Sequence, residues 1–128
     1  MHLYWNLVEK HGFTPHWFPP PPTPDRTGGP GGKDENPPTK HILSYGNKLV
    51  LQLIIDGLKL QPCRPSFISA RDAIILADEI RTHGDNYCAI WERFARRGLG
   101  TTAHLEPGNS PWAGGNRTQS FEVPEECT

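Results

Sequence analysis

The stretch PSFISARDAIILADEIRTHGDNYCAIWERFARRGLG, from Pro65 to Gly100, decides the fold of this chain. Ser66 is a typical helix N-cap, and apolar residues follow it at three- and four-residue steps. Asp85 or Asn86 can cap a second helix, which Gly98 would end. The pattern therefore predicts two helices joined by a short turn. Their apolar faces are Phe67, Ala70, Ala73, Ile74, Ala77 and Ile80 in the first helix and Tyr87, Ile90, Trp91 and Phe94 in the second.

Two further helices are expected before this pair. Residues 47–60, NKLVLQLIIDGLKL, form a nearly continuous apolar run. Its length, without an internal turn, favours a helix buried among other helices over a pair of strands. Residues 2–11 place apolar side chains on one helical face, and Gly12 fits a stop after them. The sequence thus predicts a mainly α-helical bundle of three to four helices.

The remaining segments are rich in proline and glycine, of which the 128 residues contain 14 and 13. The PPPP run at 19–22 favours polyproline II, and the segment around it is expected to be a long disordered loop. The tail contains a Gly-rich turn at 112–115, and the alternation at 120–123 could pair as a short strand or lie against the helices. We divide the chain into a partial N-terminal helix (1–12), a Pro/Gly-rich loop (13–45), a helical core (46–100) and an irregular tail (101–128).

Composition excludes several classes of partner. The net charge of −1 provides no field that would favour nucleic acid or an anionic membrane. No run approaches the ~18 apolar residues that a membrane-spanning helix needs. The first residues, MHLYWNLVEKHGF, lack the basic start and apolar core of a signal peptide. We therefore expect no nucleic-acid partner, no membrane partner and no signal peptide in these residues.

Catalytic and metal-binding motifs are absent from the sequence. The six histidines never lie three or four residues apart, and HExxH does not occur. GxSxG and a phosphate-binding glycine loop between strand and helix are also missing. Asp72 and Asp78 would point to different helical faces, so they form no acid/base pair. Arg93, Arg96 and Arg97 are expected to complement the helix dipole while remaining solvated. We predict no catalytic residue and no metal ligand in this chain.

Several segments together resemble the C-terminal part of the fungalysins, which are secreted fungal zinc metalloendopeptidases. The resemblance covers most of the chain outside residues 14–44, where this chain has an unusually long Pro/Gly loop. The SFxxAR and FAxxGLG patterns are also similar to the last helices of thermolysin-like peptidases. The matching segments are YWNLVEKHGF (4–13), NKL through QPC (47–63), residues 65–77, Cys88 with Ile90 and Trp91, residues 94–100, and FEVP (121–124) with Cys127.

The resemblance implies a fold and an activity for the longer family member. In that family a cleft separates two lobes, and the N-terminal lobe carries HExxH with its zinc ion. The C-terminal lobe is a helical bundle that forms the other wall of the cleft. We expect this chain to begin after the zinc ligands and after the histidine that steadies the oxyanion. No catalytic or metal-binding residue of the family is therefore placed on this chain, and His2 and His11 are given no such role.

The same resemblance implies an extracellular protein, in which disulfides and N-glycosylation become relevant. Three cysteines leave at least one without an intrachain partner. The helix expected at 67–81 separates Cys63 from Cys88 by roughly 22 Å at ~1.5 Å per residue, whereas a disulfide tolerates ~7 Å between Cα atoms. We expect Cys127 to pair with either Cys63 or Cys88. The sequon Asn116-Arg117-Thr118 makes Asn116 a candidate N-glycosylation site.

Two functions follow from these observations. The first is the C-terminal lobe of a fungalysin-type peptidase, whose zinc cofactor, protein or peptide substrate and N-terminal catalytic lobe are all implied by the resemblance. On this hypothesis the chain is inactive alone. The second is a non-catalytic helical packing or protein-interaction module. Both predict an apolar face that another structure covers, because the helix at 47–60 carries apolar residues on most sides.

Overall fold

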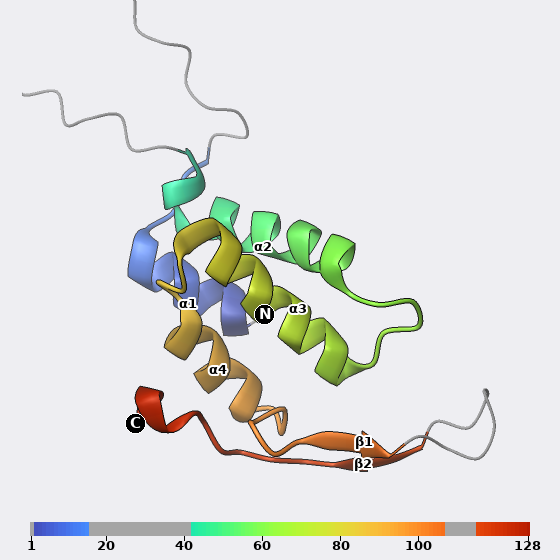
Figure 1. Ribbon diagram of the computed structural model, residues 1–128. Helices are drawn as coiled ribbons and strands as arrows, with labels where there is room; N and C mark the ends of the chain where they lie inside the picture. Colours follow the sequence, from blue (N-terminus) through green and yellow to red (C-terminus); the bar gives the residue numbers. More distant parts are fainter. Residues whose placement is uncertain (1, 16–41, 107–114) are drawn as a thin grey trace, which may run out of the picture.

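The computed structural model describes residues 2–15, 42–106 and 115–128, and this part of the chain is mainly α-helical (Figure 1). The mainly α-helical prediction is confirmed. The predicted disorder of the Pro/Gly loop and most of the turn at 112–115 lie outside the described residues. The elements are α1 (His2–His11), the 3-10 turn η1 (Ile42–Ser44), α2 (Gly46–Leu60), α3 (Phe67–Thr82), α4 (Tyr87–Ala95), β1 (His104–Glu106), β2 (Asn116–Thr118) and the 3-10 turn η2 (Glu125–Cys127).

The boundaries of α3 follow the capping signals in the sequence. The Ser66 hydroxyl accepts a hydrogen bond from the Ser69 amide at 3.1 Å, and the Ser69 hydroxyl accepts one from the Ser66 amide at 2.7 Å. This reciprocal pair is a capping box, which satisfies two amides that a helix start leaves free. At the other end His83 adopts a left-handed conformation with φ 57°, and Gly84 follows with φ 82°. The helix therefore begins and ends where local chemistry favours it.

The four helices of the described residues enclose a small core. In Figure 1, α2 and α3 run side by side, and α1 packs against α2 and α4. The amide of Gly46, at the start of α2, donates to the carbonyl oxygen of Gly12 at 2.8 Å, so the end of α1 and the start of α2 are joined directly. The buried core residues are Leu7, Leu49, Val50, Leu53, Ala77 and Ile90.

A β-hairpin and the tail form a second layer beyond the end of α4 (Figure 1). β1 and β2 pair antiparallel, with Leu105 opposite Arg117. The alternation predicted at 120–123 adds no strand, although Ser120 forms an isolated bridge with Leu99. The amide of Gly100 donates to the carbonyl oxygen of Ser120 at 2.7 Å. This hydrogen bond holds the tail against the turn after α4.

The buried Arg71 joins this layer to the helices. Its guanidinium donates to the carbonyl oxygen of Gly100 at 2.6 Å and pairs with Asp72 at 2.7 Å. It also lies over the Trp91 ring, 4.7 Å from the centroid. A planar guanidinium is suited to this combination of stacking and in-plane hydrogen bonds. The position of the hairpin therefore depends on α3 as well as on α4.

A buried polar network fixes the turn between α3 and α4. Asp78 and Asn86 are 0 % and 1 % exposed. The Asp78 carboxylate accepts hydrogen bonds from the Asn86 amide (3.0 Å), the Asn86 side-chain nitrogen (2.8 Å) and the Thr82 hydroxyl (2.8 Å). The side-chain oxygen of Asn86 contacts His11 Nε2 at 2.6 Å and Lys10 Nζ at 3.2 Å. Asn86 is the N-cap residue of α4, but its side chain makes no capping hydrogen bond. The side chain instead links the start of α4 to α1 and α3.

We expect Asp78→Ala to lower the free energy of unfolding by about 2–3 kcal/mol, because two buried Asn86 donors would lose their acceptor. The Thr82 hydroxyl keeps a second acceptor, the Asp78 carbonyl oxygen, at 3.0 Å. Urea unfolding followed by circular dichroism measures the change. Glu79→Ala, at the exposed next position of the same helix, is the control and should change stability by less than about 0.5 kcal/mol. Equal effects of the two substitutions would contradict the role given to Asp78.

Candidate functional site

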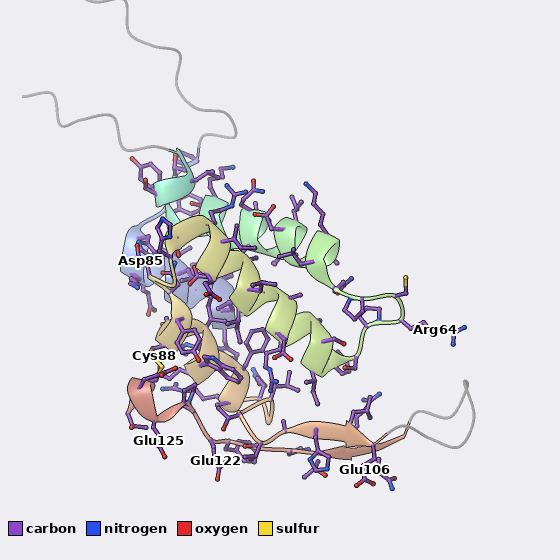
Figure 2. The ribbon with its side chains drawn as sticks, in the orientation of Figure 1. Arg64, Asp85, Cys88, Glu106, Glu122 and Glu125 are labelled. Atoms are coloured by element: carbon purple, nitrogen blue, oxygen red, sulfur yellow. A yellow bond between two sulfur atoms is a disulfide. The ribbon has the colours of Figure 1, made fainter. Side chains whose placement is uncertain are left out.

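Of the three cysteines, two form a disulfide and the third has a free thiol. Cys88, at the start of α4, is joined to Cys127 in η2, with 5.2 Å between their Cα atoms. This is one of the two pairings left open by the sequence. Cys63 is exposed and has a free thiol in the loop between α2 and α3. The disulfide therefore fixes the C-terminal turn to α4, and Cys88 is labelled at that position in Figure 2.

Asn116 is exposed at the start of β2, opposite Glu106 of β1. Successive residues of a strand point to opposite faces, so Asn116 and Arg117 lie on different faces of the hairpin. Arg117 faces α3, since its guanidinium lies 5.4 Å from the centroid of the Phe67 ring. Figure 2 shows the Glu106 side chain directed away from α3. N-glycosylation of Asn116 remains a prediction, and a glycan there would extend away from the helices.

Within the described residues, no three metal-ligating side chains lie together. None of the described residues is assigned as a zinc ligand. Four histidines are described: His2, His11, His83 and His104. His16 and His41 lie outside the described residues.

Two shifted pKa values accompany ordinary structural contacts. A hydrogen bond from Arg81 at 2.7 Å lowers the pKa of Asp56 below its usual value. Burial raises the pKa of Tyr87, and the Glu126 carboxylate adds to that shift. The two groups lie on different helices, Asp56 on α2 and Tyr87 on α4. Neither shift indicates general acid/base catalysis.

An apolar stripe lies on the exposed side of α2. We use this name for Leu51, Ile54, Ile55 and Leu58, whose exposed fractions range from 40 to 60 %. Their spacing places them on one face of the helix, whereas Leu49, Val50, Leu53 and Gly57 are buried on the other. The sequence predicted a helix buried among others, but within the described structure only one of its two apolar faces is covered. The physical reason is that α1 and α3 pack on the same side of α2.

A cavity of about 690 Å³ lies between the start of α3, the turn after α4 and the hairpin. Sequence analysis did not find it, because its walls come from four separated segments. Arg97, which we expected to complement the helix dipole while remaining solvated, is one of its lining residues. The lining is Arg64, Pro65, Ser66, Phe67, Ile68, Ala70, Arg97, Gly98, Leu99, His104, Leu105, Arg117, Thr118 and Gln119.

The fold and these surfaces define a class of protein, a disulfide-bonded helical domain with an uncovered apolar helix face. The model of the family described as fungalysin metallopeptidase matches residues 1–103. The chain therefore belongs to the fungalysin family. The resemblance read from the sequence is confirmed.

Similar curated proteins are named as extracellular metalloproteinases. Extracellular metalloproteinase 5 of Arthroderma otae is 42 % identical over 125 residues, which cover 98 % of this chain and 16 % of that protein. Extracellular metalloproteinase MEP of Leptosphaeria maculans is 42 % identical over 123 residues, covering 96 % of this chain and 16 % of that protein. The chain thus spans about a sixth of the length of these relatives.

The names of the relatives also indicate where this family member is located. Their names describe extracellular proteins, and the location of this family member is extracellular, as predicted. Among the described helices, none combines the length and the apolar character required to cross a lipid bilayer.

Proposed function

We propose that this chain is the C-terminal helical lobe of a secreted zinc metalloendopeptidase and that it forms one wall of the substrate cleft. The longer protein would hydrolyse peptide bonds of protein or peptide substrates with a zinc-activated water. Family membership and the names of the relatives support the metalloproteinase activity. The apolar stripe on α2 is the observation that supports a packing role for these 128 residues.

The stripe favours a partner surface because it is continuous and apolar. Its four large side chains occupy about two turns of one helix, and Leu76 and Ile80 of α3 are exposed as well. Contiguous apolar surface of this kind marks protein contacts more often than free surface. In the proposed arrangement it packs against the lobe that carries HExxH. Zinc binding and catalysis then belong to that lobe, since the described residues of this chain do not fit a metal site.

A chimera tests this function. The 128 residues replace the matched segment of Extracellular metalloproteinase 5 of Arthroderma otae, and zinc content and casein hydrolysis are measured. We expect the chimera to bind zinc and hydrolyse casein, whereas the isolated chain does neither. Stoichiometric zinc with casein turnover by the isolated chain would contradict the proposal.

Substitutions on the stripe sharpen the test. The double variant Ile54→Asp with Leu58→Asp should lower casein hydrolysis by the chimera at least about tenfold, because burying unpaired carboxylates in an apolar contact is costly. The circular dichroism of the isolated chain should not change, since both positions are exposed. Thr101→Asp, at an exposed position of the turn before β1, is the control and should keep full activity.

The alternative is a non-catalytic module that binds another protein through the same stripe. The exposed apolar residues of α2 and α3 are equally compatible with this function. The chimera separates the two, because an interaction module would not restore zinc-dependent hydrolysis to the relative. An inactive chimera that folds and retains the disulfide would favour the alternative.

A further inference from the structure

The charged residues described in the lining of the cavity between α3, α4 and the hairpin are basic. Arg64, Arg97 and Arg117 line it, and His104 lies beside them. Among the described residues that line it, none is an aspartate or a glutamate. The Glu106 carboxylate lies 3.8 Å from Nε2 of the lining residue His104. Figure 2 shows Glu106 directed away from α3, on the outer side of the hairpin.

The three arginines of the cavity differ from the other described arginines. Arg71, Arg81 and Arg96 pair with the carboxylates of Asp72, Asp56 and Glu92. Arg93 donates to the side-chain oxygen of Asn6 at 2.6 Å. By contrast, the cavity arginines have no carboxylate partner and no hydrogen-bond acceptor within the described part of the chain, and Figure 2 shows the Arg64 side chain directed outward from the loop between α2 and α3. Among the described arginines, those without such a partner are the three that line this cavity.

The floor of the cavity is apolar. Phe67 is 66 % exposed, and Leu99 and Leu105 lie beside it in the lining. The Arg117 guanidinium stacks on the Phe67 ring at 5.4 Å from the centroid. A stacked guanidinium still presents its N–H groups at its edge, where a carboxylate can accept two hydrogen bonds. The first residues of α3 also line the cavity, so the positive end of that helix dipole adds to the field.

We propose that this cavity binds an acidic, extended peptide segment of another protein. In this arrangement, glutamate or aspartate side chains of the peptide accept hydrogen bonds from Arg97 and Arg117, and Arg64 attracts a further carboxylate at the rim. An apolar side chain of the same peptide packs on Phe67. Charge complementarity with an apolar floor favours a peptide over a simple anion, because a phosphate or sulfate would leave the Phe67 surface uncovered. The proposal does not depend on the proposed peptidase activity.

The test uses the whole 128-residue chain and a defined probe. The probe is acetyl-Gly-Glu-Glu-Phe-Glu-Glu-Gly-amide, titrated by calorimetry at low ionic strength. Its matched controls replace every glutamate by glutamine, or the phenylalanine by glycine. We expect each control peptide to bind about tenfold more weakly, since charge-assisted hydrogen bonds and burial of one aromatic side chain each contribute on this scale.

Variants of the protein locate the site. Arg97→Gln and Arg117→Gln should each weaken binding of the acidic probe about tenfold. Arg96→Gln is the matched control, because Arg96 is the adjacent arginine, pairs with Glu92 and does not line the cavity. Phe67→Ala should weaken binding similarly, whereas Phe121→Ala, at an equally exposed phenylalanine outside the cavity, should not. All these side chains are exposed, so the fold should survive each change.

Several outcomes would overturn the proposal. Absence of binding by the unmodified chain would do so, as would equal losses for Arg96→Gln and Arg97→Gln. Equal affinity for the glutamate and glutamine probes would show that charge plays no part. Tighter binding of a single-stranded oligodeoxythymidylate of the same net charge would assign the arginines to nucleic acid instead. A failed peptidase chimera leaves all these measurements unaffected.

Discussion

Replacing Gly46 by alanine is expected to lower the free energy of unfolding by about 3 kcal/mol or more, because the new methyl group has no room. Gly46 begins α2 at a position where that helix lies against the backbone of α1. A Cβ atom built there would collide with the carbonyl oxygen and carbon of Leu7 and with the amide nitrogen of Val8, far inside 3.0 Å. All three are backbone atoms, so no side-chain rotation relieves the overlap. One of the two helices must move away from the other.

The control for this prediction is Gly57→Ala in the same helix. A Cβ atom at Gly57 would lie 2.9 Å from Cγ1 of Ile74, which belongs to a side chain. Ile74 can shift, and alanine favours a helix interior over glycine by about 1 kcal/mol. We therefore expect stability within about 1 kcal/mol of the unmodified chain. Urea unfolding with an unchanged m-value measures both variants. A Gly46→Ala variant as stable as Gly57→Ala would contradict the close approach of α1 and α2.

The sequence predicts the helices well because their signals are local. Ser66 begins α3 with the capping box expected of its position, and Gly84 follows its last turn with φ 82°. The apolar residues of α1 recur with helical spacing, and Leu7 among them is completely buried. Each of these signals involves residues within about one turn of each other. Such short-range preferences can be read without knowing the tertiary contacts.

The hairpin and the cavity are not predicted from the sequence, and the reason is physical. β1 and β2 have three residues each, too few for the alternation that identifies a strand. The segment that leads into the hairpin is instead held by tertiary contacts such as the Arg71 hydrogen bond to Gly100. The cavity depends on where this hairpin lies relative to α3. The place of Arg97 in the cavity lining could therefore only be found from the structure.

The apolar stripe on α2 is predicted only in part from the sequence. The run at 47–60 predicts correctly that the helix is apolar on most sides. It does not say which side another helix of the same chain covers. In the structure Leu53 is completely buried while its neighbour Ile54 is 41 % exposed. The local sequence thus shows that α2 has two apolar faces. Only the packing of α1 and α3 shows which of these faces is exposed to solvent.

Removing the disulfide with Cys88→Ser and Cys127→Ser is expected to lower the free energy of unfolding by about 4 kcal/mol, the chain-entropy cost of a cross-link spanning 39 residues. The bond closes a loop that contains α4, the hairpin and the tail. Without it the unfolded chain gains conformational freedom, while the folded helices keep their contacts. The measurement is urea unfolding of the double variant and of a disulfide-bonded reference, both made in a Cys63→Ser background so that the exposed Cys63 thiol cannot exchange with the disulfide of the reference.

The Cys63→Ser chain with its disulfide intact is the control, and its stability should lie within about 0.5 kcal/mol of the unmodified chain, because Cys63 is exposed and has no disulfide partner. A second readout follows the tail. The amides of Gly100 and Thr101 donate to Ser120 and Glu122 at 2.7 and 3.0 Å, so their hydrogen exchange should accelerate when Cys127 is released. Unchanged exchange at both amides would mean that the hydrogen bonds from Gly100 and Thr101, rather than the covalent link, hold the tail against the turn after α4.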